Sequence, residues 1–164
     1  MINAIVCVDK NFAIGKDNKL LFYLPRDLNF FKNHTKNSIV LVGRKTLESF
    51  PESKPLKGRS TICLCSRENK RDDCYCVHSF EEALSLIIEL SKTQEIWILG
   101  GQSVYEKFID ICDRVWVTKV DADGDGDSFF PNLDKRTDFK CLWESEAEQD
   151  NGYTIKFCEY GRIY

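Results

Sequence analysis

Apolar and polar residues follow two periods along this chain, one typical of strands and one typical of helices. Strand-like patterns cover residues 2–8, 38–42, 60–65, 74–77, 95–99, 114–121, 139–145 and 153–160. Helix-like patterns cover residues 25–32, 46–50, 79–88 and 103–109. Because the helical segments lie between strands, their order predicts crossover connections and a mainly parallel sheet.

Two of these strands, at residues 39–42 and 96–99, are apolar throughout, as is typical of parallel strands covered on both faces. The last two strands have no helix between them, and the polar link at residues 146–152 suits an antiparallel return. We therefore expect a single-domain α/β fold over residues 1–164. Its central sheet would be mixed and mainly parallel, with about eight strands, about four flanking helices and an antiparallel C-terminal strand.

Composition narrows the possible functions without selecting one. The 164 residues are 43% hydrophobic and 30% charged, which matches ordinary globular proteins and excludes disordered or collagen-like chains. The net charge of -3, with scattered Lys and Arg, gives no footprint for nucleic acid, and no apolar run approaches the roughly 20 residues of a membrane helix. Since residues 1–10 lack a secretory leader, we expect a cytoplasmic protein with reduced thiols. We also expect a monomer with a small-molecule partner.

Two patterns resemble metal sites, and each has a simpler interpretation. The acidic run at residues 121–127 begins like an EF-hand loop, but the twelfth position is Asn132 where a bidentate Glu is needed, so a solvated turn fits better. Two Cys-x-Cys pairs, at residues 63–65 and 74–76, have thiols that could bind zinc. Strand alternation also places both thiols of each pair on one face, and we expect no metal.

Two segments, residues 39–46 and 96–103, run from a buried strand through glycine into a helix. Such helix ends offer free N–H groups to phosphate, although a tight turn gives the same pattern. Neither segment has the GxGxxG fingerprint or the P-loop pattern. Arg44, Lys45 and Arg67 could supply cations around one extra phosphate and so select NADP over NAD, but the spacing also fits solvated charge pairs.

Asp27 is the candidate for acid–base chemistry. It falls in the first turn of the helix that begins at Pro25, with Phe30 and Phe31 on neighbouring faces. Burial beside aromatic rings would raise the pKa of this carboxyl, which could then bind an amidine-like group and assist protonation. An acid that only favours the helix dipole fits the same pattern, so both interpretations stay open.

Five motifs occur in one order: residues 13–15 (AIG), 24–32 (LPRDLNFFK), 42–49 (VGRKTLES), 100–105 (GGQSVY) and 126–131 (GDSFFP). In order and spacing they resemble the successive signatures of dihydrofolate reductase. The resemblance extends over about residues 2–160, and five collinear motifs are far more specific than any single one. It implies an NADPH-dependent reductase that transfers a hydride to C6 of dihydrofolate, in support of one-carbon metabolism and thymidylate synthesis.

The resemblance also implies roles for single residues. Asp27 would bond the pterin and promote protonation of N5, Thr118 would bond that acid, and Arg59 would clamp the glutamate carboxylate of the substrate. The implied substrate-binding residues are Ile5, Val6, Asp27, Phe31, Lys32, Arg59, Leu99 and Thr118. The implied catalytic residues are Asp27, Phe22, Tyr105 and Thr118.

The cofactor site implied by the resemblance surrounds a cis peptide bond between Gly100 and Gly101. Its residues would be Val6, Cys7, Ile14, Gly15, Lys19, Leu20, Gly43, Arg44, Lys45, Thr46, Leu64, Cys65, Ser66, Arg67, His78, Gly100, Gly101, Gln102, Ser103, Val104 and Tyr105. Among these, His78 would lie near the adenine end. The protein would mainly align two rings and control one proton.

The chain departs from the family pattern at two places. Leu21-Phe22 stands where Pro-Trp is usual, so an indole N–H that would reach the pterin through water is missing. Cys65 stands where serine is common, which weakens one hydrogen bond to the cofactor. These departures leave open a folate or dinucleotide binder without turnover, and a related reductase that acts on another heterocycle, as in riboflavin synthesis. Phe31 and Arg59 together with Asp27 favour folate.

Overall fold

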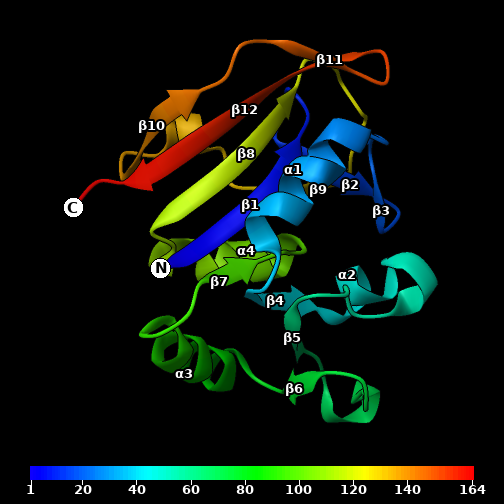
Figure 1. The fold of residues 1–164 in the computed structure, drawn as a ribbon, viewed down its shortest axis with the longest axis vertical. Helices are drawn as coiled ribbons and strands as arrows, with labels where there is room; N and C mark the ends of the chain where they lie inside the picture. Colours follow the sequence, from blue (N-terminus) through cyan, green and yellow to red (C-terminus); the bar gives the residue numbers. More distant parts are fainter.

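A central sheet organises the molecule in the computed structural model, which describes residues 1–164. The strands of the sheet are β1 Ile2–Val8, β4 Ile39–Gly43, β5 Ser60–Leu64, β6 Tyr75–Val77, β7 Ile96–Ile98, β8 Arg114–Val120, β10 Phe139–Glu144, β11 Glu148–Asp150 and β12 Tyr153–Arg162. Their order is β10-β12-β8-β1-β7-β4-β5-β6, with β11 paired to β12. Figure 1 shows the sheet extending from β10 at the top to β6 at the bottom.

The strand directions confirm a mixed, mainly parallel sheet. Strands β6, β5, β4, β7, β1 and β8 run parallel to one another. Strand β12 then pairs antiparallel with β8 on one side and with β10 and β11 on the other. The pattern in residues 146–152 did not predict β11, because this three-residue strand is polar and is followed directly by the hairpin turn at Asn151 and Gly152.

Four α-helices cover the two faces of the sheet: α1 Pro25–Thr35, α2 Arg44–Glu48, α3 Phe80–Ser91 and α4 Gln102–Phe108. Successive residues of β1 point to opposite faces of the sheet and so belong to two different core clusters. Ala4 belongs to a cluster that contains residues of α3 and α4, including Phe108. Ile5 belongs to a second cluster with Leu47 of α2, against which Phe31 of α1 packs. Helices α1 and α2 therefore lie on one face, and α3 and α4 lie on the other.

A small second sheet joins β3 Lys19–Leu20, β2 Ala13–Lys16 and β9 Ser128–Phe129, in the order β3-β2-β9. It was not predicted, because its strands are too short to show a period. The acidic run leads into this sheet: the Asp127 N–H donates to the Gly15 carbonyl at 2.9 Å, and the Asp127 side chain accepts from the Asp17 N–H at 3.2 Å. The run is thus a turn between strands, as expected, and no group of three or more His, Cys, Asp or Glu side chains is arranged to hold a metal ion.

The two Cys-x-Cys pairs lie on neighbouring strands. Cys63 of β5 is the direct register partner of Cys76 of β6, and Cys63, Cys65, Cys74 and Cys76 all contribute to one core cluster. This arrangement confirms that each pair presents both thiols to one face. All eight cysteines of the chain are free.

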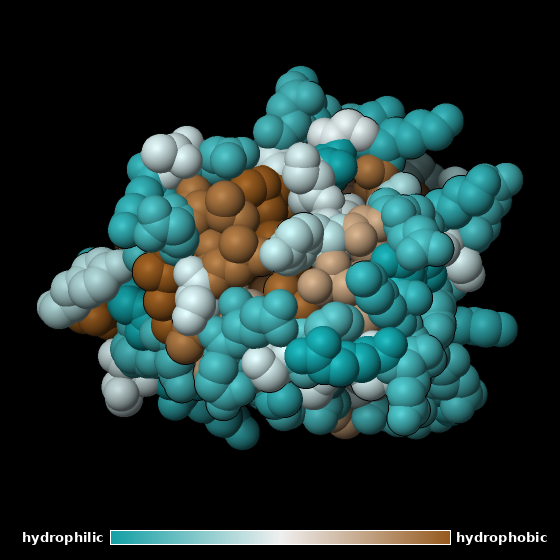
Figure 2. All heavy atoms as spheres, turned by 90° about the horizontal axis from the view of Figure 1, so that it is seen from below, coloured by the Kyte–Doolittle hydropathy of each residue, from teal (hydrophilic) through white to brown (hydrophobic).

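The face of the molecule drawn in Figure 2 is mainly hydrophilic. Figure 2, seen from below, shows apolar side chains gathered in one area of the side on which Figure 1 places α3 and β6. Ile88 of α3 is 44% exposed and Tyr75 of β6 is 61% exposed. No helix combines the length and the apolar character required to span a bilayer.

Candidate active site

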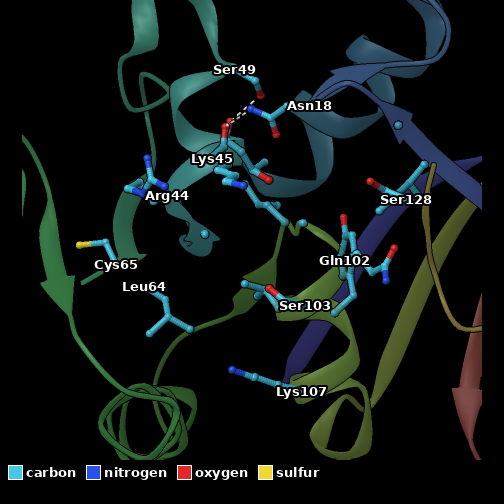
Figure 3. A pocket seen from close by; sticks show the side chains of 18 of the residues that line it. Asn18, Arg44, Lys45, Ser49, Leu64, Cys65, Gln102, Ser103, Lys107 and Ser128 are labelled. Atoms are coloured by element: carbon cyan, nitrogen blue, oxygen red, sulfur yellow. Dashed lines mark hydrogen bonds between the residues drawn. The ribbon is translucent and has the colours of Figure 1, made fainter. Parts of the chain in front are cut away.

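A cavity of about 650 Å³ opens at the carboxyl ends of strands β1, β4, β5 and β7, where ligands of open α/β sheets usually bind. Its walls come from the end of β1, the β4–α2 junction, the residues after β5 and the β7–α4 junction. In Figure 3, Arg44 and Cys65 project from one side, whereas Gln102, Ser103 and Lys107 of α4 lie on the other. The volume is typical of small-molecule and cofactor sites.

The residues expected to hold a cofactor line this cavity, with two exceptions. Arg67, which begins a short helix after Ser66, and Gly100 are not among the lining residues. The lining also includes residues that the sequence did not single out for it: Asn18, Ser49, Ser79, Phe80, Lys107 and Ser128. Leu99, expected to contact substrate, lines the same cavity.

Both glycine junctions leave backbone donors facing this region. Gly43 is the N-cap of α2 and Gly101 is the N-cap of α4, and neither helix has a side-chain cap. The Gly43 N–H donates to the Gly100 carbonyl at 2.8 Å, which joins the two junctions, and the Gly100–Gly101 peptide bond is cis. A Cβ atom on Gly101 would lie 3.0 Å from Thr46 Oγ1, so a larger residue at position 101 would crowd the Thr46 side chain.

Helix α2 begins at Arg44, two residues earlier than its pattern predicted, because Gly43 is extended and caps it. Arg44 and Lys45 consequently lie in the first turn instead of the preceding loop. The Arg44 guanidinium pairs with Glu48 one turn later, at 2.8 Å. This pair is partly exposed, so solvent and a ligand phosphate can compete with Glu48 for the guanidinium.

Asp27 borders a second, small cavity of about 40 Å³ that adjoins the first. Cys7, Ile14 and Leu20 line both cavities, so the small cavity beside the acid lies directly next to the large one. Asp27 is half-buried, and its Oδ1 accepts a hydrogen bond of 2.6 Å from the hydroxyl of Thr118 on β8. The acid is therefore held beside the cleft instead of pointing into bulk water.

Burial raises the pKa of Asp27 above its ordinary value. Hydrogen bonds from Thr118 and Cys7 act in the opposite direction and lower this pKa, while the nearby charge of Asp150 raises it. Because burial outweighs the two donors, the net shift is upward, and the carboxyl retains a proton to higher pH than an exposed aspartate does. A carboxyl of this kind is suited to general acid–base chemistry.

The expected carboxylate clamp lies at the other end of α1. Arg59 donates from Nε and Nη2 to Thr35 Oγ1, each at 3.1 Å, and from Nη2 to the Lys32 carbonyl at 3.2 Å. Its guanidinium also lies 5.9 Å from the ring centroid of Phe31. Burial lowers the pKa of Arg59. Arg59, Phe31, Lys32 and the buried Ile5 line neither cavity.

Other expected site residues have defined partners. The Tyr105 hydroxyl donates to the Ile5 carbonyl at 2.7 Å, and burial raises its pKa, so it remains a donor that links α4 to β1. Phe22 lines the small cavity and packs edge-on against Tyr153, with ring centroids 4.7 Å apart. His78 Nδ1 lies 2.9 Å from the Cys65 carbonyl, at the far end of the large cavity.

One lining residue had a local signal in the sequence. Asp17 and Asn18 form the turn between β2 and β3, and both have positive φ, at 49° and 61°. Asp and Asn at a two-residue hairpin turn are a recognised signal. From this turn Asn18 Nδ2 donates to the Lys45 carbonyl at 3.1 Å, across the edge of the cavity (Figure 3).

Comparisons with known proteins agree with this geometry. The family model described as "Dihydrofolate reductase" matches residues 1–162. A dihydrofolate reductase of Neisseria meningitidis serogroup B is 36% identical over 165 residues, which cover 98% of each chain. A dihydrofolate reductase of Bacillus subtilis is 32% identical over 163 residues, covering 98% of this chain and 94% of the relative.

A solved structure is similar over the whole chain as well. The dihydrofolate reductase from Enterococcus faecalis complexed with NADP(H) and RAB-propyl superimposes with a TM-score of 0.87 at 29% identity. The match covers 100% of this chain and 97% of that one. With the family model matched over residues 1–162, this chain belongs to the dihydrofolate reductase family.

Proposed function

We propose that this protein is a dihydrofolate reductase, which uses NADPH to reduce 7,8-dihydrofolate to 5,6,7,8-tetrahydrofolate. The observation that carries the proposal is a half-buried acid, Asp27, hydrogen-bonded to Thr118 and bordering a small cavity next to a larger one with room for a dinucleotide. Family membership and the printed names of the relatives support the same reaction. The product would serve one-carbon metabolism and thymidylate synthesis.

The chain's own residues fit NADPH. Uncapped helix ends at Gly43 and Gly101 suit the two phosphates of a pyrophosphate, and the glycines allow its oxygens to approach the backbone. Arg44 and Ser66 line the same end of the cavity and would hold the extra phosphate that distinguishes NADPH from NADH. Val6, Leu99 and Tyr105 would exclude water where the rings meet. When bound, NADPH supplies the hydride.

The substrate would lie along α1. Asp27 in its first turn and Thr35 in its last are separated by eight residues, or roughly 12 Å of helix. This length suits a molecule with a heterocycle at one end and a carboxylate at the other. Asp27 would bond the amidine-like edge of the pterin and hold the proton destined for N5, while Arg59 would bind the glutamate carboxylate in a bidentate manner.

The proton-holding role follows from the environment of Asp27. Its raised pKa lets the acid keep a proton to higher pH than an exposed aspartate does, and the Thr118 hydroxyl holds one carboxyl oxygen in place. Phe22 beside it has no N–H with which to order a water molecule, so proton delivery would depend more heavily on Asp27 than in a protein with tryptophan there.

A steady-state assay separates this function from its rivals. We expect the purified protein to oxidise NADPH only when dihydrofolate is added, with a preference for NADPH over NADH. A protein that binds folate analogues without oxidising NADPH would be a binding module. Oxidation of NADPH with a pyrimidine precursor of riboflavin, but not with dihydrofolate, would identify a related reductase instead.

We further propose that the protein acts as a monomer in the cytoplasm. The eight free cysteines, among them the exposed Cys141, suit a reducing compartment. Sedimentation equilibrium of the active protein tests the monomer, and a dimer with higher activity per chain would contradict it.

A further inference from the structure

A second acid lies close to Asp27 and has no part in the chemistry proposed above. Asp150, the last residue of β11, is only 4% exposed. It precedes the two-residue turn of Asn151 and Gly152, whose φ angles of 49° and 85° are those of a tight hairpin turn. Burying a carboxylate costs free energy unless it accepts hydrogen bonds, so Asp150 requires hydrogen-bond donors nearby.

The partner of Asp150 is the N-terminus of α1. Arg26 and Asp27 both donate their backbone N–H groups to Asp150 Oδ2, at 3.0 and 3.2 Å. Helix α1 has no cap of its own, because its N-cap residue is Leu24. Pro25 has no N–H, and the Leu28 N–H already bonds the Leu24 carbonyl at 2.9 Å. Asp150 thus completes the hydrogen bonding of the first turn.

The same hairpin also binds the segment that precedes α1. Asn151 Nδ2 donates to the Tyr23 carbonyl at 2.8 Å. The turn therefore contacts the chain on both sides of Leu24 and fixes where the helix begins. Since Asp27 is one of the two residues whose N–H is held, its position in the cleft depends on a hairpin more than 120 residues away in sequence.

We propose that Asp150 is a positioning residue for the reduction: it caps α1 from the β11–β12 hairpin, sets the place of Asp27 and adds a like charge beside it. This inference rests on the proposed function. A charge on Asp150 disfavours a second negative charge nearby, so it would help Asp27 to keep its proton.

The groups that face Asp27 are few, so the effect of Asp150 can be separated. Thr118 of β8 and Cys7 of β1 both donate to the carboxyl, and Asp150 of β11 is the one further charge that acts on its pKa. The Arg26 guanidinium does not neutralise Asp150, because it pairs with Glu148 at 3.3 Å. Glu148 therefore provides a control acid on the same strand.

Three variants of the full chain distinguish the cap from the charge. Asp150→Asn keeps an oxygen that accepts from the two N–H groups but removes the charge. Asp150→Ala removes both. Glu148→Gln removes a neighbouring charge that contacts only the Arg26 side chain. Each is measured by single-turnover NADPH oxidation across pH, and by carbon NMR titration of the Asp27 carboxyl in aspartate-labelled protein.

For Asp150→Asn we expect the Asp27 titration and the fall of the rate to move to lower pH. The rate should be unchanged in acid and roughly threefold lower in alkali, the size of a like-charge effect beyond direct contact. For Asp150→Ala we expect kcat/KM for dihydrofolate to fall roughly tenfold or more, because Asp27 is displaced. Asparagine should rescue that loss at low pH, and Glu148→Gln should match the wild type.

Identical NMR titrations in the wild type and Asp150→Asn would overturn the charge effect, and an Asp150→Ala variant with unchanged kinetics would overturn the positioning role. Asparagine keeps the cap, so the test stands even where the alanine variant does not fold. A wild type that fails to reduce dihydrofolate would refute the proposed function alone. In that case the NMR titration of Asp27 still decides whether Asp150 acts on the acid.

Discussion

Replacing Thr118 with valine removes one hydroxyl group and preserves the shape of a residue that is 1% exposed. The lost interaction is the 2.6 Å hydrogen bond to Asp27 Oδ1. A hydrogen bond to a charged group contributes about 1.5–3 kcal/mol to folding, whereas one to a neutral acid contributes about half as much. For a protein of this size, we expect the Tm of Thr118→Val at neutral pH to fall by about 3–10 °C.

The pH dependence of that loss gives the sharper test. The folded-state pKa of Asp27 is raised, so its ionisation costs stability, and stability declines as pH rises from the unfolded pKa through the folded pKa. The Thr118 donor limits this cost because it lowers the pKa. Without it, the folded pKa rises further, and the difference between wild type and Thr118→Val should grow as pH increases through that window.

Thermal unfolding followed by circular dichroism from about pH 4 to about pH 8 measures the effect. Thr61→Val is the matched control, since Thr61 is also a buried strand threonine but its hydroxyl has no hydrogen-bond partner. This control should be as stable as the wild type or more so, by the same amount at every pH. If both variants show the same flat pH dependence, the Thr118–Asp27 bond does not control the acid and the reasoning fails.

Three further outcomes follow from the site. Arg59→Lys should raise KM for dihydrofolate roughly tenfold or more with little change in KM for NADPH, because a bidentate contact is lost, and a pteridine substrate without glutamate should show no such change. Arg44→Ala should narrow the preference for NADPH over NADH, whereas Arg67→Ala should not, because Arg67 lies outside the cavity. Steady-state kinetics with both cofactors measure the preference, and an equal loss in the two variants would contradict this prediction. Asp27→Asn should raise the Tm at neutral pH and leave it unchanged below the unfolded pKa, since ionisation of the acid costs folding energy. Melting curves that show a loss of stability at neutral pH would contradict this.

The main sheet and the four helices could be predicted because they are long enough to show a period or a continuous apolar run. The strand at residues 2–8 was predicted to the residue. The two-residue strands β3 and β9 escaped because they are too short to carry a pattern and their pairing depends on other segments of the chain.

The members of the site could be named by resemblance, but their arrangement could not be derived from local sequence. Whether Asp27 was an exposed helix-end acid or a buried one was open, and Thr118, 91 residues away, decides it. Asp150 gave no signal at all, because a residue 123 positions from Asp27 is brought to α1 only by the pairing of β11 with β12. Motifs predict which residues share a site, whereas burial and capping come from long-range contacts.

The central claim is that Asp27 supplies the proton while the separate cofactor cavity holds NADPH. Single-turnover reduction of dihydrofolate by Asp27→Asn, together with its affinity for NADPH by fluorescence titration, tests this most directly. We predict a loss of roughly 100-fold or more in hydride transfer, within the range of general acid catalysis, with NADPH affinity unchanged. Transfer at the wild-type rate, or a parallel loss of NADPH binding, would contradict the account.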